Sequence, residues 1–137
     1  MRVLGIDYGT RRIGLAVTDP GETMAFPYAT LEKTTRDRLF FELSAIIERE
    51  GVEKLVLGLP LSLDGRETLT TRQVKNFADR LRRKFERPVI LVDESLSTWA
   101  AEADLEAAGV KKKRRKAVLD QQAAVRILET YLARNQT

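Results

Sequence analysis

The sequence predicts an α/β protein in which helices cover a mixed β-sheet. The chain begins with segments that read as antiparallel strands joined by short turns. Segments with helical spacing of apolar residues then alternate with two nearly continuous apolar runs, "KLVLGL" (Lys54–Leu59) and "PVILV" (Pro88–Val92). Such runs are typical of parallel strands that are buried on both faces. An antiparallel start followed by strand–helix–strand units indicates one mixed sheet.

The first part of the chain predicts three strands and one helix. Arg2–Tyr8 and Arg12–Thr18 read as strands, and the glycine-led turn between them indicates a hairpin. Met24–Thr30 predicts a short third strand. A helix is expected over Thr35–Glu50, where apolar residues recur at helical spacing and Gly51 supplies a stop.

The rest of the chain predicts helices around the two apolar strands. Thr70–Phe85 has the apolar stripe of a helix. Ser97 or Thr98 can cap a further helix that runs to Ala108, with Gly109 as its C-terminal cap. A last helix is expected over Lys116–Arg134. The length of 137 residues, without repeats or linkers, predicts a single domain over 1–137.

Composition excludes several kinds of chemistry. The sequence contains no cysteine and no histidine, so it can form neither a Cys/His zinc site nor a Ser-His-Asp or Cys-His catalytic group. Acid–base chemistry must therefore use Asp, Glu, Lys, Tyr or metal-bound water. The absence of cysteine, of a signal peptide and of a long apolar run predicts a cytoplasmic protein without membrane contact. The basic run Lys111–Lys116 is either a solvated loop or a contact for a phosphate backbone.

Acidic residues occupy two positions beside the predicted sheet where an unpaired charge is unfavourable. Alternation puts Asp7 on the same face of its strand as Gly5, where a missing side chain leaves room for close approach. Capping of the following turn is the alternative role for Asp7. Asp93 and Glu94 follow the last predicted strand, at the carboxyl edge where α/β sheets bind ligands. One of these two acids could instead cap the next helix.

The third position is Asp120 in the last helix. At about 100° per residue, it falls in the middle of the apolar stripe, whose members are Ala117, Ala123, Ala124, Ile127 and Tyr131. A charge there is costly unless it is paired or binds a metal, and an ion pair with a buried arginine is the alternative. Acids on three separate elements predict a site for divalent metal, since Mg²⁺ prefers carboxylate oxygens. Two ions about 4 Å apart could activate water and stabilise the leaving oxygen of a phosphodiester.

Four segments together resemble the YqgF family, also called RuvX, of the RNase H-like superfamily. In order, they are "GIDYGTRRIGLAV" (Gly5–Val17), "GLPLSLDG" (Gly58–Gly65), "DESLST" (Asp93–Thr98) and "DQQAAVRIL" (Asp120–Leu128). The resemblance covers essentially the whole chain. It implies an RNase H-like fold with a five-stranded mixed sheet flanked by helices, and a metal-dependent nuclease.

The resemblance also implies the residues of the site. An acidic triad of Asp7, Glu94 and Asp120 would be catalytic and would bind Mg²⁺ or Mn²⁺, as a pair of ions, with Asp93 as a neighbour. Ser95 stands where the family commonly has arginine, which puts one substrate contact in doubt. Residues expected to contact nucleic acid, with plain surface charge as the alternative, are Arg11, Arg12, Arg66, Lys111, Lys112, Lys113, Arg114 and Arg115.

For function, the resemblance implies a hydrolase that processes the 5′ end of pre-16S rRNA in ribosome biogenesis. The main alternative is a Holliday junction resolvase that acts on branched DNA in recombination and repair. A resolvase would be a homodimer, because two active sites must face the four-way junction. A nucleic-acid-binding module without catalysis is a third class, which Ser95 permits. A nucleotide-binding protein like actin or a sugar kinase fits poorly, because those proteins use two lobes and this chain has room for one.

Overall fold

The computed structural model describes residues 1–61, 65–93 and 112–134, and within 112–117 the backbone alone. In chain order, the elements are β1 (Arg2–Tyr8), β2 (Arg12–Thr18), β3 (Ala25–Glu32), α1 (Arg36–Glu50), β4 (Val52–Leu59), α2 (Leu69–Phe85), β5 (Val89–Asp93) and α4 (Lys112–Arg134). The helix predicted to end at Ala108 lies outside the described residues.

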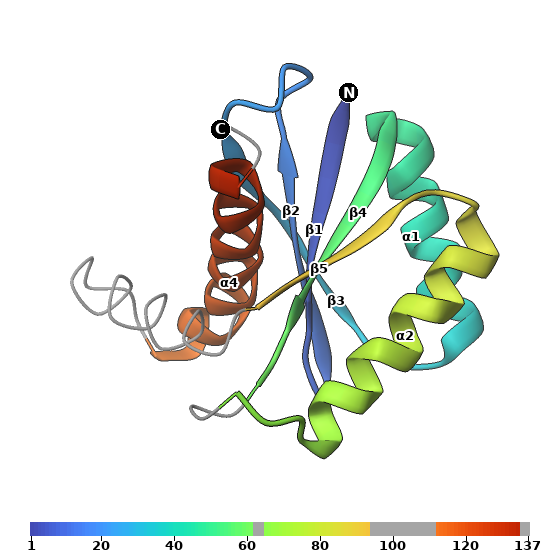
Figure 1. Ribbon diagram of the computed structural model, residues 1–137, viewed down its shortest axis with the longest axis vertical. Coiled ribbons are helices and arrows are strands. Elements are labelled where there is room, and N and C mark those ends of the chain that lie inside the picture. The colour runs from blue at the N-terminus through green and yellow to red at the C-terminus, as the bar shows by residue number, and fades with distance from the viewer. Residues whose placement is uncertain (62–64, 94–111, 135–137) are drawn as a thin grey trace.

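The described strands form one five-stranded sheet in the order β3-β2-β1-β4-β5. The pairs β1–β2 and β2–β3 are antiparallel, whereas β1–β4 and β4–β5 are parallel. Figure 1 shows α4 on one side of this sheet and α1 and α2 on the other. The predicted α/β class and the mixed five-stranded sheet are confirmed. Because β1, β4 and β5 run in the same direction, their carboxyl ends share one edge of the sheet.

Each face of the sheet packs into its own hydrophobic core. Along β1, Leu4 and Ile6 belong to the core under α1 and α2, whereas Val3 belongs to the core under α4. This is the alternation that the sequence predicted. It follows that Asp7, which shares the face of Val3 and Gly5, lies on the α4 side of the sheet.

The ends of α1 show why the sequence folds into a helix there. The Thr35 side chain accepts a hydrogen bond from the N–H of Arg38, which satisfies one of the free donors at the start of the helix. At the other end, Gly51 has a φ of 63°, in the left-handed region that favours glycine, and its N–H bonds to helix carbonyls. The predicted stop at Gly51 is confirmed.

Three predicted elements differ from the structure by two residues or more. The strand predicted from Lys54 already begins at Val52. The third strand is Ala25–Glu32, because its pairing with β2 continues as far as Glu32 opposite Arg12. The last helix begins at Lys112 rather than Lys116, so most of the basic run is helical backbone and not a loop. Lysine and arginine are good helix formers, and no glycine or proline separates them from the apolar stripe. Among the helices described, none is long and apolar enough to cross a membrane.

Candidate active site

Asp7 lies near the carboxyl end of β1, at the edge where the parallel strands end together. It is half-buried, and its partner across the β1–β2 ladder is Gly14. Neighbouring strands lie about 4.8 Å apart, so whatever rests on Gly14 also lies close to Asp7.

The element that rests on Gly14 is the start of α4. A Cβ on Gly14 would lie 1.9 Å from the backbone oxygen of Asp120, and a Cβ on Gly5 would lie 2.5 Å from Cγ of Leu128. Since Cβ atoms do not approach other atoms so closely, α4 can lie here only because both residues are glycines. The backbone of Asp120 therefore sits on the sheet partner of Asp7, and the two predicted acids come to the same end of the same face.

The Asp120 side chain is only 20% exposed and contacts an arginine from β2. Nε of Arg12 lies 3.0 Å from Oδ2 of Asp120, and the Arg12 side chain is 34% exposed. The ion pair considered as the alternative role of Asp120 is therefore present, although its arginine is not fully buried. Oδ2 is nevertheless buried and accepts no well-oriented hydrogen bond from any described residue. The ion pair leaves this oxygen only partly satisfied.

The electrostatics of Asp120 follow from this burial. Burial raises the pKa of the Asp120 carboxyl above its ordinary value, and the Arg12 guanidinium only partly opposes that effect. The next residue, Gln121, donates from Nε2 to the Thr30 hydroxyl of β3 at 3.1 Å, which fixes the rotation of the helix start. A carboxylate held in this way would be stabilised by a further cation.

The third predicted acid, Glu94, lies outside the described residues, whereas its neighbour Asp93 is described. Along β5, Val92 packs in the core under α4 and Leu91 packs against the opposite core. Alternation therefore puts Asp93 on the α1–α2 side, away from Asp7. Within the described part of the chain, no three acidic side chains gather closely enough to hold a metal ion. The metal site thus stays a prediction that rests on Asp7 and Asp120 together with Glu94.

The predicted nucleic-acid contacts are only partly described. Arg11 is exposed, and with Arg12 it lines a cavity of about 510 Å³ next to the β1–β2 turn. Arg66 is exposed in the connection that leads to α2. Lys111 lies outside the described residues, as do the side chains of Lys112, Lys113, Arg114 and Arg115. Among the predicted cations, Arg12 contacts a predicted acid, Asp120.

The structural role of one residue at this edge of the sheet, Lys33, was not predicted from the sequence. Lys33 donates from Nζ to the carbonyl of Gly9 at 3.1 Å and lies 4.0 Å from the centre of the Tyr8 ring. Its backbone N–H donates to the carbonyl of Arg11 at 2.9 Å. Lys33 therefore holds the turn that carries the predicted arginines. In the sequence, the role of Lys33 is indicated only by its position after the third strand. Its contacts with the β1–β2 turn depend on the order of strands in the sheet, which local patterns do not give.

Two solved structures share the fold. T. thermophilus RuvC in complex with a Holliday junction substrate matches with a TM-score of 0.58 and 18% identity, over 100% of this chain and 98% of that one. The fowlpox virus resolvase, in complex with its substrate Holliday junction DNA, matches with a TM-score of 0.59 and 10% identity, over 100% of both chains. These likenesses confirm the predicted RNase H-like fold.

The sequence itself has much closer relatives. The family described as "RuvX: Holliday junction resolvase" matches residues 1–134. A protein of Maridesulfovibrio salexigens named "Putative pre-16S rRNA nuclease" is 58% identical over 134 residues, covering 98% of this chain and 99% of that protein. A protein of the same name from Nitratidesulfovibrio vulgaris is 55% identical, over 96% of this chain and 93% of its own length. The resemblance of the four motifs thus extends along nearly the whole sequence, and the chain belongs to the RuvX (YqgF) family.

Proposed function

We propose that this protein is a metal-dependent nuclease that processes the 5′ end of pre-16S rRNA in the cytoplasm. One observation carries the proposal: the buried Oδ2 of Asp120 has only its ion pair with Arg12 and no well-oriented hydrogen bond from the described residues, at the end of the sheet face that also holds Asp7. The relatives that are 55% and 58% identical over nearly the whole chain support pre-16S rRNA as the substrate.

The donor set fits hard divalent cations. Asp7, Glu94 and Asp120 would hold Mg²⁺ or Mn²⁺ through carboxylate oxygens, the ligands that such ions prefer. The bound ions would supply an activated water and stabilise the charge that develops on the leaving oxygen of the phosphodiester. Alternation along β5 puts Asp93 on the face of the sheet opposite to Asp7, which supports Glu94 as the third acid.

The protein's own residues would prepare this chemistry. The contact between Gly14 and α4 fixes where Asp120 stands relative to Asp7, and the Gln121 hydrogen bond keeps α4 from turning. Arg12 holds the Asp120 carboxylate in one orientation and brings a positive charge to the place where a phosphate would approach. Arg11 beside it, and the exposed Arg66, would contact the phosphate backbone.

A cleavage panel tests the proposal. The substrates are a pre-16S rRNA leader, single-stranded DNA and a four-way DNA junction, each with Mg²⁺, with Mn²⁺ and with EDTA. We expect metal-dependent cleavage of the leader, and its loss in Asp7→Asn, Glu94→Gln and Asp120→Asn. Asp79→Asn is the matched control, because Asp79 is an exposed acid on α2 that pairs with Arg82. Retained cleavage in any of the three variants would remove that acid from the mechanism.

Metal binding has its own readout, independent of activity. A ligand that binds only the native state raises stability by about 2.7 kcal/mol at one hundred times its dissociation constant. Mn²⁺ should therefore raise the melting temperature of the wild type and of Asp79→Asn, but not that of Asp7→Asn or Asp120→Asn. An equal rise in all four proteins would refute metal binding at this site.

Junction resolution is the second candidate, and the description of the matching family favours it. A resolvase would make paired, symmetrical cuts in the four-way junction and would act as a dimer. The panel separates the two functions by the preferred substrate, and sedimentation of the protein on junction DNA reports the number of subunits. If the wild type cuts none of the substrates, the nuclease proposal fails, and binding without catalysis becomes the better account.

A further inference from the structure

A second cavity opens beside the candidate active site, on the opposite face of β1. It measures about 240 Å³ and lies between the end of β1, the start of α1 and the middle of α2. Tyr8, Leu39 and Phe77 form its apolar wall. Tyr8 directly follows Asp7 in β1, so the cavity and the predicted acids share the same end of the strand but lie on its two sides.

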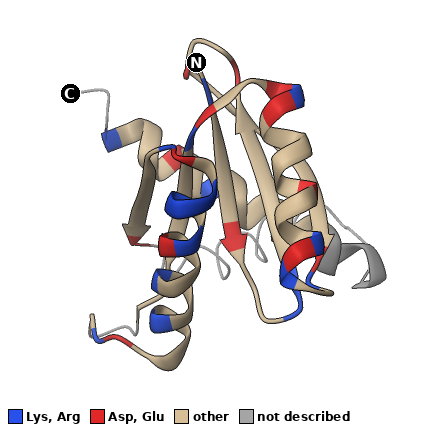
Figure 2. Cartoon of the chain, turned by 90° about the vertical axis from the view of Figure 1, so that its right-hand side faces the viewer, with Lys and Arg blue, Asp and Glu red and all other residues tan. Residues whose placement is uncertain are grey.

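The charged side chains that line this cavity are all positive. They are Lys33, Arg36 and Arg80. Neither arginine forms an ion pair with any of the described residues, and Asp79, the acid next to Arg80, instead pairs with Arg82 at 3.0 Å. Figure 2 looks onto this side of the molecule and shows Lys and Arg spread along α2. Three cations around one cavity, at the positive end of the α1 dipole, make it a strong site for an anion.

A line of positive charge joins this cavity to the predicted acids. Lys33 lines both this cavity and the larger one formed with Arg11 and Arg12. Arg12 in turn lies 3.0 Å from Asp120. Glu32 is the one acid in the lining of the larger cavity, and it stands opposite Arg12 in the β2–β3 ladder. Cationic side chains therefore pass around the end of β1 from one face of the sheet to the other.

We propose that the cavity at Lys33, Arg36 and Arg80 binds a phosphodiester of the substrate strand outside the cleaved bond, and this rests on the proposed nuclease function. The strand would pass around the end of β1 from Asp120, along Arg11, to this cavity. The Tyr8 ring is already in contact with the Phe77 ring, at 4.3 Å between ring centres, and with Lys33, whose Nζ lies 4.0 Å from the Tyr8 ring centre. The cavity therefore recognises phosphate and not a stacked base, which makes the contact independent of base sequence.

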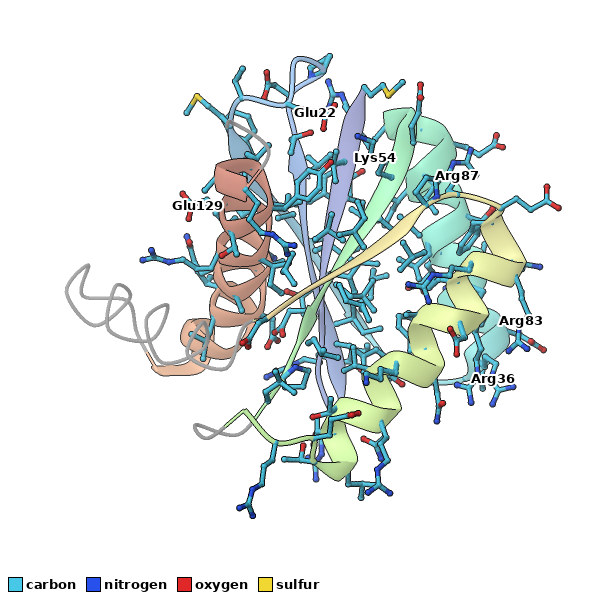
Figure 3. The ribbon with its side chains drawn as sticks, in the orientation of Figure 1. Glu22, Arg36, Lys54, Arg83, Arg87 and Glu129 are labelled. Carbon is cyan, nitrogen blue, oxygen red and sulfur yellow. The ribbon has the colours of Figure 1, made fainter. Side chains whose placement is uncertain are left out.

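Charge removal at the two arginines tests the proposal. The variants are Arg36→Gln and Arg80→Gln, and the matched control is Arg83→Gln, which removes the same charge from α2 outside the cavity. Figure 3 labels Arg36 at the start of α1 and Arg83 near the end of α2. Lys33 is left intact because it holds the Gly9 carbonyl. None of the three arginine side chains makes a hydrogen bond or ion pair with the described residues, so the melting temperatures should match the wild type.

Binding of a fluorescent single-stranded RNA is measured by anisotropy in EDTA over a range of salt concentrations. Each lost phosphate contact lowers the slope of log affinity against log salt by about 0.7 on a single strand. We expect this change in Arg36→Gln and in Arg80→Gln, and a smaller one in Arg83→Gln. In cleavage assays the two cavity variants should raise KM and leave kcat unchanged, because the contact is the same in ground and transition states.

The outcomes separate this inference from the function on which it rests. If the wild type binds and cleaves RNA, and both cavity variants keep its salt slope and KM, the cavity is not a phosphate site although the nuclease stands. An equal effect in Arg83→Gln would mean that overall charge, not the cavity, attracts the strand, and would also overturn the inference. If the wild type neither binds nor cleaves RNA, the proposed function fails and the inference fails with it.

Discussion

Replacing Gly14 by alanine tests whether α4 must rest directly on the sheet for the two predicted acids to meet. The added Cβ would lie 1.9 Å from the backbone oxygen of Asp120, 2.3 Å from its carbonyl carbon and 2.9 Å from its Cα. All three atoms belong to the helix backbone, so no side-chain rotation can relieve the contact. The start of α4 must move away from β2.

The size of the effect follows from these distances. To bring the closest contact from 1.9 Å to an ordinary 3.4 Å, the helix must withdraw by about 1.5 Å at Asp120. Overpacking of a core costs about 1–3 kcal/mol, and we expect the upper end of this range because backbone must move. A misplacement of about 1 Å in a catalytic group can lower the rate about 100-fold. Gly14→Ala should therefore lose both stability and cleavage.

Urea unfolding followed by circular dichroism measures the first effect. With a slope of about 2 kcal/mol per molar urea, a loss of about 3 kcal/mol lowers the midpoint by about 1.5 M. Gly21→Ala is the control, because its Cβ would meet only side-chain atoms of Asp19 and Thr23, at 3.2 and 3.9 Å. A Gly14→Ala protein with the wild-type midpoint and cleavage rate would refute the argument. Lost stability with normal cleavage would show that this contact does not set the position of Asp120.

Three further predictions concern stability. Asp120→Asn should raise the free energy of unfolding at neutral pH, because it removes a buried, partly satisfied charge. Folding raises the pKa of Asp120, so this gain in stability should be absent below about pH 3.9 and should grow as the pH rises through the higher native pKa. Urea midpoints from pH 3 to 7 measure the gain. A variant less stable than the wild type at pH 7 would mean that the Arg12 ion pair outweighs burial. Hydrogen bonds from the Met24 N–H and from Thr23 lower the pKa of the Asp19 carboxyl to about 2. The stability that Asp19 adds to the fold is therefore present above about pH 3.9 and is lost as the pH falls through about 2. Asp19→Ala should therefore lower the midpoint at neutral pH and flatten the acid limb of the stability curve, and an unchanged curve would contradict this. Phe77→Ala should cost about 3–5 kcal/mol because Phe77 is only 2% exposed, and a loss below about 1 kcal/mol would show that this core repacks.

Local patterns were enough to predict the strand that carries Asp7. The structure gives β1 and β2 the predicted bounds, since each apolar run ends at turn residues. Strict alternation assigned Asp7 to the face of Gly5, and helical spacing assigned Asp120 to the inward stripe of the last helix. Both assignments depend only on residues near one another in the sequence, and both are confirmed.

The contacts between elements could not be predicted in the same way. The pairing of Arg12 with Asp120 depends on how far along its axis α4 lies, and the contact at Gly14 decides that. The placement of Lys33 and Arg80 around one cavity depends on the packing of α1 and α2 on one face of the sheet. The basic run gives conflicting signals for the start of α4, because lysine and arginine are good helix formers whereas positive charge at the positive end of a helix dipole is unfavourable.

If Asp7 and Asp120 act together as proposed, the position of α4 also sets the time at which the protein can become active during its synthesis. Asp7 leaves the ribosome with the first strand, whereas Asp120 belongs to the last described helix, and the face between them stays uncovered until that helix docks. Domains generally fold as units, so the second core of the sheet cannot be completed until α4 has emerged. A nascent chain that ends before Lys112 lacks Asp120 and, on the proposed mechanism, should therefore be unable to cut RNA. This would protect the rRNA of the translating ribosome until α4 has been made.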